Sequence, residues 1–190
     1  GGRLPTPMGN QTSGDRVMAN NFTQCLEIIL ENEGGFVDHP KDPGGMTNLG
    51  VTRGTYEQYM GRHVTEEEMR SLTPDDVAPV YKQNYWDACK CDKMTDNGLA
   101  LMTFDWAVNS GGSKPAKCIQ KFVSAKQDGV IGPKTLGLIA EKNPREIIEY
   151  MYDSRQKYFE SLRTFDTFGR GWTRRNKHTF EMALDMSEAQ

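Results

Sequence analysis

The sequence lacks the features of a membrane protein and of a nucleic-acid-binding protein. No apolar run approaches the roughly 20 residues of a membrane span, so we expect no stable membrane insertion. Lys and Arg number 23 against 26 Asp and Glu, which gives a net charge of −3 and no basic field for nucleic acid. The 190 residues, 36% hydrophobic and 26% charged, have the composition of a soluble globular protein. A chain of this length can form one good core or two small packed lobes.

Patterns for metals, disulfides and cofactors are also missing. The four cysteines are scattered, and the pair Cys89-x-Cys91 lacks the second pair, or the paired histidines, of a zinc site. Cys25 and Cys118 have apolar neighbours in the sequence, as small core residues do. We therefore predict reduced structural thiols, no metal site and no organic cofactor.

The first 21 residues contain no apolar segment of the kind that a secretory signal requires. They are polar and rich in Gly, Pro, Ser and Asn, so we interpret residues 1–21 as a flexible arm. The sequence as given therefore shows no visible export signal.

Strand signals are almost absent, whereas helical stripes recur along the chain. A first helix is predicted from the apolar spacing of Phe22, Leu26 and Ile29, and it ends at Gly34-Gly35. Residues 36–52 are rich in turn residues and are expected to form a loop or a small β-hairpin. About eight helices indicate a mainly α globule with this insertion after the first helix. The later helices are predicted to begin near Thr65, Thr73, Gly98, Lys114, Pro133 and Asn143, and after Trp172.

Glu33 is the most informative polar residue. It lies four residues after Ile29 and seven after Leu26, so it continues the apolar face of the first helix. Apolar neighbours and the negative end of the helix both disfavour a charged carboxylate. A carboxyl that stays protonated near neutral pH can act as a general acid. The alternative is a partly exposed residue at a fraying helix end.

A second carboxylate follows in "KDPGGMTNLG". Pro43 and the two glycines predict a tight reversal that can bring Asp42 back over the end of the first helix. Two carboxylates across a cleft are the minimum for hydrolysing a glycosidic bond. Thr47 can hold a water there, and Asn48 is a candidate for hydrogen bonds to sugar. A plain turn with no catalytic role is the alternative for Asp42.

The apolar segment "LMTFDWAVNSGG" holds another polar group. Asp105 and Asn109 are four residues apart, so they share one face of a helix, and Trp106 is adjacent. Aromatic rings beside acids and amides suit carbohydrate, because the ring stacks on the sugar while the polar groups take its hydroxyls. These residues are either the floor of a sugar cleft or satisfied core residues.

Four motifs in order resemble one known family. The segment "ENEGGFVDHPKDPGGMTNLGVT" is similar to the signature of the N-acetylmuramidases of glycoside hydrolase family 108, whose members include phage endolysins. The segments "FDWAVNSGG", "QDGVIGPKTL" and "FGRGWTRR" resemble the peptidoglycan-binding segment of that family's second half. The resemblance extends from residue 22 to residue 177.

The resemblance implies a lysozyme-like α fold that binds bacterial peptidoglycan and cleaves the β-1,4 bond between N-acetylmuramic acid and N-acetylglucosamine. It implies that Glu33 is the catalytic acid, and the spacing Glu33-x8-Asp42 is similar to that of phage-type lysozymes. Some members carry an acid where this chain has Met46, so the base stays open, with Asp42 first and Asp38 second. The substrate-binding candidates are Asp38, Thr47, Asn48, Asp105, Trp106 and Asn109.

On this interpretation, residues 22–110 form the catalytic region, and residues 111–190 form a peptidoglycan-binding-like region packed into the same globule. We expect a monomeric phage endolysin that stays in the host cytoplasm before lysis and then acts in the periplasm or cell wall. A virion-associated or secreted enzyme would have the same sequence features. The alternatives in function are a lytic transglycosylase and a non-catalytic cell-wall-binding or virion module.

Overall fold

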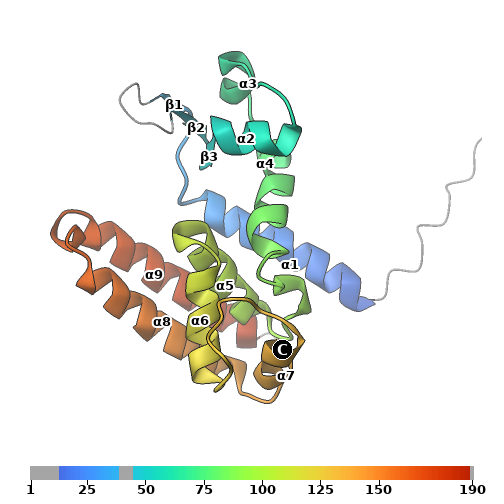
Figure 1. The fold of residues 1–190 in the computed structure, drawn as a ribbon, viewed down its shortest axis with the longest axis vertical. Helices are drawn as coiled ribbons and strands as arrows, with labels where there is room; N and C mark the ends of the chain where they lie inside the picture. The colour runs from blue at the N-terminus through green and yellow to red at the C-terminus, as the bar shows by residue number, and fades with distance from the viewer. Residues whose placement is uncertain (1–12, 39–44, 189–190) are drawn as a thin grey trace, which may run out of the picture.

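The computed structural model describes residues 13–38 and 45–188 of the chain. The mainly α fold is confirmed, as is the small β insertion after the first helix (Figure 1). The helices are α1 (Ser13–Leu30), α2 (Arg53–Met60), α3 (Glu66–Arg70), α4 (Pro74–Tyr81), α5 (Asn97–Ser110), α6 (Ser113–Phe122), α7 (Pro133–Ala140), α8 (Pro144–Ser161) and α9 (Phe165–Glu188). A π-helical turn, Lys82–Trp86, continues α4, and a 3₁₀ turn, Cys91–Lys93, precedes α5.

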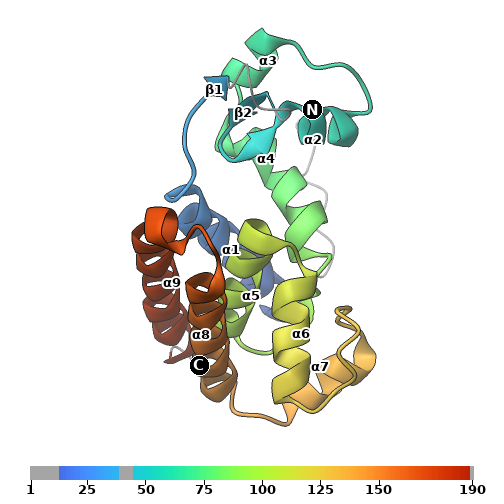
Figure 2. The same ribbon diagram turned by 60° about the vertical axis from the view of Figure 1, so that its left-hand side comes forward.

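The insertion is a sheet of three short antiparallel strands, β1 (Val37–Asp38), β2 (Met46–Asn48) and β3 (Val51–Thr52), in the order β1-β2-β3. In both ribbon views the strands lie with α2 and α3 at one end of the molecule, and α5 to α9 form the other end (Figures 1 and 2). Helices α1 and α4 connect the two ends. The two ends are two lobes that share one continuous hydrophobic core.

Two helix boundaries differ from the sequence prediction, and α2 has no counterpart among the predicted helices. Helix α1 begins at Ser13, so residues 13–21 of the expected flexible arm are helical, and residues 1–12 lie outside the described residues. Helix α9 begins at Phe165 rather than after Trp172, and it contains Gly169 and Gly171. Helix α9 packs along α5 and α8. This packing outweighs the low helix propensity of the two glycines.

Side-chain caps set other boundaries as the sequence predicts. Thr65 accepts a hydrogen bond from the backbone N–H of Glu68, whose carboxylate accepts one from the N–H of Thr65, which is a capping box. Thr73 and Asp76 form a second capping box at the start of α4, with Pro74 in the first turn. These local signals fix where α3 and α4 begin.

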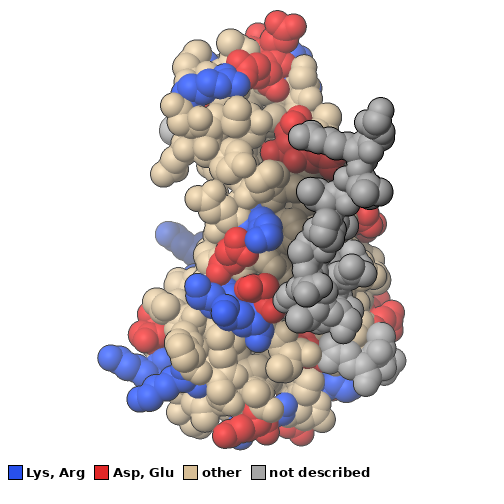
Figure 3. All heavy atoms as spheres, turned by 90° about the vertical axis from the view of Figure 1, so that its right-hand side faces the viewer, with Lys and Arg blue, Asp and Glu red and all other residues tan. Residues whose placement is uncertain are grey.

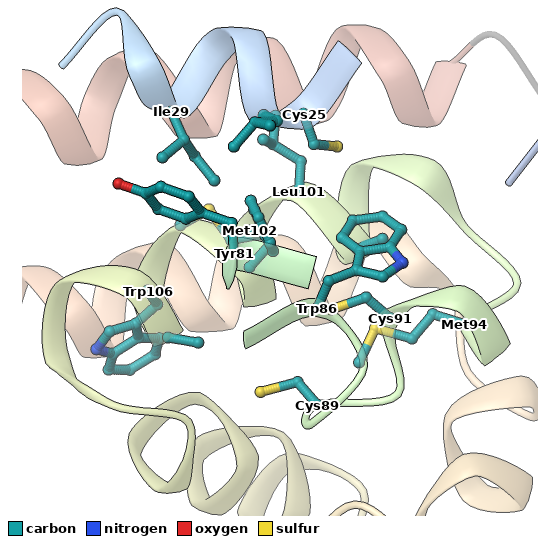
Figure 4. Close-up of a cluster of buried hydrophobic side chains, with 14 of the residues drawn as sticks. Cys25, Ile29, Tyr81, Trp86, Cys89, Cys91, Met94, Leu101, Met102 and Trp106 are labelled. Carbon is teal, nitrogen blue, oxygen red and sulfur yellow. The ribbon is translucent and has the colours of Figure 1, made fainter. Parts of the chain in front are cut away.

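Helix α5 is the centre of the core, and its residues 98–107 are all buried. Its Phe104 ring meets the rings of Trp86 and Phe22 edge to face, with ring centroids 5.2 and 5.8 Å apart. Figure 4 shows Leu101 and Met102 of this helix among the aromatic and sulfur-containing side chains of the cluster. A helix that is buried on every side needs no polar face, which explains its nearly continuous apolar sequence.

The described cysteines are free thiols, and Cys25, Cys89 and Cys91 are buried (Figure 4). Burial raises the pKa of the Cys89 thiol to about 11, so it stays protonated at neutral pH. Over residues 13–38 and 45–188, no His, Cys, Asp and Glu residues form a group of three that could hold a metal ion. Within the same residues, no helix is both long and apolar enough to cross a bilayer. On the face drawn in Figure 3, acidic and basic side chains are interspersed.

Candidate active site

Glu33 lies one turn beyond α1. Its backbone N–H donates to the carbonyl of Leu30 at 3.1 Å, which extends the helix end to this residue. Its side chain is 20% exposed and lines a pocket of about 310 Å³ between the two lobes. The remaining described lining comes from both lobes: Gly50, Val51, Thr52, Thr55, Val80, Tyr81, Tyr85, Val108, Asn109 and Arg175.

The two-residue turn between β2 and β3 forms one wall of this pocket. Leu49 and Gly50 have φ angles of 52° and 78°, as a type I′ hairpin turn requires at both central positions. The N–H of Leu49 donates to the carbonyl of Gly34 at 3.0 Å, and the Tyr81 hydroxyl donates to the carbonyl of Leu49 at 2.8 Å. The turn, which we call the Gly50 turn, is therefore fixed from both sides, beside Glu33.

Only glycine fits at position 50. A Cβ atom there would lie 2.7 Å from Oε2 of Glu33 and would also contact the hydroxyl of Tyr81. Its positive φ is a second reason, because this conformation is costly for most other residues. The backbone of the turn therefore approaches the Glu33 carboxyl more closely than any side chain would permit.

Helix α9 forms the opposite wall through Arg175. Its Nη1 lies 3.4 Å from Oε1 of Glu33, and its Nε and Nη2 donate to Oδ1 of Asp105 at 3.2 and 3.0 Å. The other oxygen of Asp105 accepts from Arg155 Nη1 at 2.7 Å and from the Thr179 hydroxyl at 3.2 Å. Arg175 thus joins a buried ion pair to the carboxyl in the pocket.

Charge and burial act against each other in this cluster. Burial penalises the charged form of Asp105, but the guanidinium groups of Arg155 and Arg175 outweigh that penalty and lower its pKa. Burial raises the pKa of Tyr81 and of Tyr85, and the negative charge of Glu33 raises both further. The Tyr81 phenol therefore stays neutral and keeps its proton for the hydrogen bond to Leu49.

Comparison with known proteins identifies the family of this chain. Residues 26–111 match the family Glycosyl hydrolase 108. The solved structure of Brucella abortus SagA is 38% identical in sequence, with a TM-score of 0.77, over 89% of this chain and 97% of that chain. This chain belongs to the glycosyl hydrolase 108 family. A comparison with curated proteins gives no match.

As a member of the glycosyl hydrolase 108 family, the protein is a glycoside hydrolase with a lysozyme-like, mainly α fold, and its family supports peptidoglycan as the substrate. The family match ends at residue 111, whereas Arg155 and Arg175 come from α8 and α9. Part of the pocket of this glycosyl hydrolase 108 protein is therefore built by the second half of the chain.

The structure brings together two of the predicted site residues, Glu33 and Asn109, on the wall of one pocket. It corrects the interpretation of Asp105 and Trp106 as a cleft floor, because the two side chains are 0% and 3% exposed and neither lines the pocket. The alternative of a satisfied core residue describes Asp105. Trp106 of α5 is instead buried in the hydrophobic core, with its ring centroid 6.0 Å from the guanidinium of Arg155.

The described candidates of the β insertion, Asp38, Thr47 and Asn48, do not line the pocket. Asn48 is buried, and its side-chain amide donates to the carbonyl of Met69 at 2.8 Å, so it ties β2 to α3 instead of facing sugar. Thr47 is half-buried on β2, and Asp38 is exposed on β1. Asp42 lies outside the described residues, so the identity of the base stays a prediction.

Sequence reasoning missed Tyr81 and Arg175 as site residues. Tyr81 fitted the apolar stripe of its helix, and nothing in that stripe indicates that its hydroxyl reaches the Gly50 turn. Arg175 stands in the motif "FGRGWTRR", but it is 142 residues from Glu33. The motif indicated that this segment is typical of the family, but no spacing rule predicts that Arg175 contacts a residue at the end of the first helix.

Proposed function

We propose that this glycoside hydrolase is an N-acetylmuramidase that hydrolyses the β-1,4 bond between N-acetylmuramic acid and N-acetylglucosamine, with Glu33 as the general acid. The observation that carries this proposal is the position of the Glu33 carboxyl. It lies in the pocket with Oε1 beside Arg175 and Oε2 beside the Gly50 turn. In the proposed reaction it gives its proton to the leaving glycosidic oxygen.

The rest of the described pocket suits a sugar. Asn109, Thr52 and Thr55 offer amide and hydroxyl groups, and Tyr85 offers a half-buried aromatic ring. Polar groups that fix orientation beside an aromatic ring are the usual lining of a carbohydrate site. This composition supports a saccharide substrate in the same pocket as Glu33.

Asp42 is the first candidate for the second carboxylate, and Asp38 is the second. A separation from Glu33 of roughly 6.5–9.5 Å would give inversion, and roughly 5–5.5 Å would give retention. If neither acid approaches Glu33, groups of the substrate assist the reaction. Asp42→Asn then keeps near-wild-type turnover, whereas loss of turnover by orders of magnitude identifies the base.

A lytic transglycosylase is the second candidate, because it needs one acid and no activated water. Among the described residues that line the pocket, Glu33 is the one carboxylate, which is the observation in its favour. The two reactions leave different ends on the glycan. Hydrolysis leaves a reducing N-acetylmuramic acid, and transglycosylation leaves an anhydro sugar.

We further propose that the enzyme acts as a monomeric endolysin, held in the host cytoplasm until it reaches the wall. The segment "DGVIGPKTL" supports wall contact, because it leads into α7 beside an open pocket of about 610 Å³. That pocket is lined by charged and apolar residues of the segment 124–141. It lies apart from the Glu33 pocket, with which it shares no lining residue.

Digestion of purified sacculi with mass spectrometry of the products tests the proposal. We expect reducing N-acetylmuramic acid from the wild type and a loss of about 10²–10⁴-fold in Glu33→Gln, because general acid catalysis contributes about that factor. Glu31→Gln is the matched control, since its side chain is 67% exposed two residues earlier. Anhydro products would favour the transglycosylase, and binding without any cleavage would favour the non-catalytic module.

A further inference from the structure

The Arg155, Asp105 and Arg175 side chains form a charged triad behind the pocket. Asp105 is shared by two guanidinium groups, so the triad holds two positive charges and one negative charge. Arg155 and Asp105 have no exposed side-chain surface, and Arg175 is 16% exposed. The net charge of +1 is therefore shielded from solvent and faces one group in the pocket, the Glu33 carboxyl.

We propose that Arg175 is a positioning residue for Glu33, and that the buried Asp105–Arg155 pair holds Arg175 in place for this task. The proposal rests on the proposed role of Glu33 as the acid. It also assigns α8 and α9, which lie beyond the family match at residues 26–111, to the catalytic centre.

Arg175 uses different nitrogens to bind Asp105 and to contact Glu33. Arg175 uses Nε and Nη2 for Asp105, which fixes the plane of its guanidinium group, and only Nη1 reaches Glu33. A planar guanidinium held by two bonds loses little further freedom when it makes a third. Arg175 therefore restricts Oε1 of Glu33 and leaves Oε2 on the side of the Gly50 turn.

The charge of the triad acts on the reaction as well as on the geometry. When Glu33 gives up its proton it becomes a carboxylate, and the net positive charge beside it stabilises that carboxylate. A preorganised charge in a site partly shielded from water can do this without reorganising during the reaction. The contact between Arg175 and Glu33 thus becomes a salt bridge as the proton leaves.

The other groups that face Glu33 do not supply this charge. Tyr81 and Tyr85 approach from α4 and the turn that follows it, and both are neutral phenols. The Gly50 turn offers backbone atoms only. Asp105 of α5 stands behind Arg175, and the nearby pair of Glu31 and His178, 3.8 Å apart, is exposed. Arg175 is therefore the cation in contact with the Glu33 carboxyl among the described residues.

The test compares kcat and KM of wild type, Arg175→Met and Arg175→Lys on soluble peptidoglycan fragments. In Arg175→Met we expect kcat to fall at least about tenfold with little change in KM, because the lost interaction acts on the transition state.

Arg175→Lys separates charge from geometry. Lysine keeps the positive charge but cannot bind Asp105 with two nitrogens of a rigid fork. We expect kcat to remain below the wild-type value with little change in KM, because the charge is kept while the anchored geometry is lost. Arg174→Met is the matched control on the exposed face of α9 and leaves kcat and KM unchanged.

The outcomes distinguish this inference from the proposed function. If Glu33→Gln is inactive while Arg175→Met keeps the wild-type kcat, the inference is wrong and the proposed function stands. If Glu33→Gln remains active, the proposed function itself fails. Should Arg175→Met not fold, as thermal unfolding would show, Arg175→Lys decides, and an unchanged kcat in that variant overturns the inference.

Discussion

The wall formed by the Gly50 turn is held mainly by backbone atoms, whereas the wall formed by α9 is held by charged side chains. On the first wall, Leu49 bonds to the carbonyl of Gly34 and accepts from the neutral hydroxyl of Tyr81. On the second, Arg175 contacts two carboxylates. Glu33 lies between the two walls. Its position therefore depends on neutral hydrogen bonds on one side and on ion pairs on the other, and these respond differently to pH.

Neutral hydrogen bonds of the Gly50 turn do not titrate near neutral or mildly acidic pH. The ion pairs of α9 depend on Asp105 remaining ionised, and their burial protects them from screening by salt. We therefore expect acid to loosen the α9 wall first. A substitution on the α9 wall and one on the turn wall should therefore differ in how much each lowers the free energy of unfolding and how much each lowers turnover.

The largest effect is expected for Asp105→Asn. The substitution leaves the fully buried guanidinium of Arg155 without its carboxylate partner, and breaking a buried pair in this way costs about 3–5 kcal/mol. Urea unfolding followed by circular dichroism measures the change in the free energy of unfolding. Asp153→Asn on the exposed face of α8 is the control, and equal stabilities of the two variants would contradict a structural role for the buried pair.

The lowered pKa of Asp105 also predicts how the stability of the wild type changes in acid. Its pKa in the folded protein is lowered, whereas an Asp in an unfolded chain has a pKa of about 3.9. Its stabilisation is therefore fully present above about pH 3.9 and is lost as the pH falls through the lower, folded pKa. The free energy of unfolding, measured from pH 6 downward, should decline in that window, and Asp105→Asn should lack this part of the decline.

Gly50→Ala perturbs the turn wall and should lower both stability and turnover. The positive φ and the contact of the new Cβ with the Tyr81 hydroxyl strain the turn. The same Cβ would push against Oε2 of Glu33, and a displacement of about 1 Å in an active site can cost about 10²-fold in rate. Gly54→Ala is the matched control, because a Cβ there meets nothing within 4 Å. A Gly50→Ala enzyme with wild-type turnover would show that the close approach to Glu33 is unimportant.

The smallest effect is expected for Tyr81→Phe, which removes only the hydroxyl that bonds to Leu49. A lost neutral hydrogen bond costs about 0.5–1.5 kcal/mol, and we expect turnover to fall only several-fold. Tyr59→Phe is the control, since Tyr59 is exposed on α2. A loss as large as that of Gly50→Ala would mean that the hydroxyl acts on the substrate directly.

Local sequence signals predicted much of the fold. The capping residues Thr65 and Thr73 begin helices as expected, and the apolar spacing that ends in Glu33 identified the carboxyl that lines the pocket. The start of α9 was predicted too late, because two glycines lower helix propensity and only packing on α5 and α8 compensates for them.

The sequence by itself determined the helical periodicity and the capped starts of α3 and α4, because each depends on residues within a few positions of one another. Only the tertiary structure decided that Asp105 is an anchor for Arg175 and not part of a cleft floor. Its partners are 50, 70 and 74 residues away, and Arg175 reaches Glu33 across 142 residues. Such contacts follow from how α5, α8 and α9 pack, and no local pattern contains that packing.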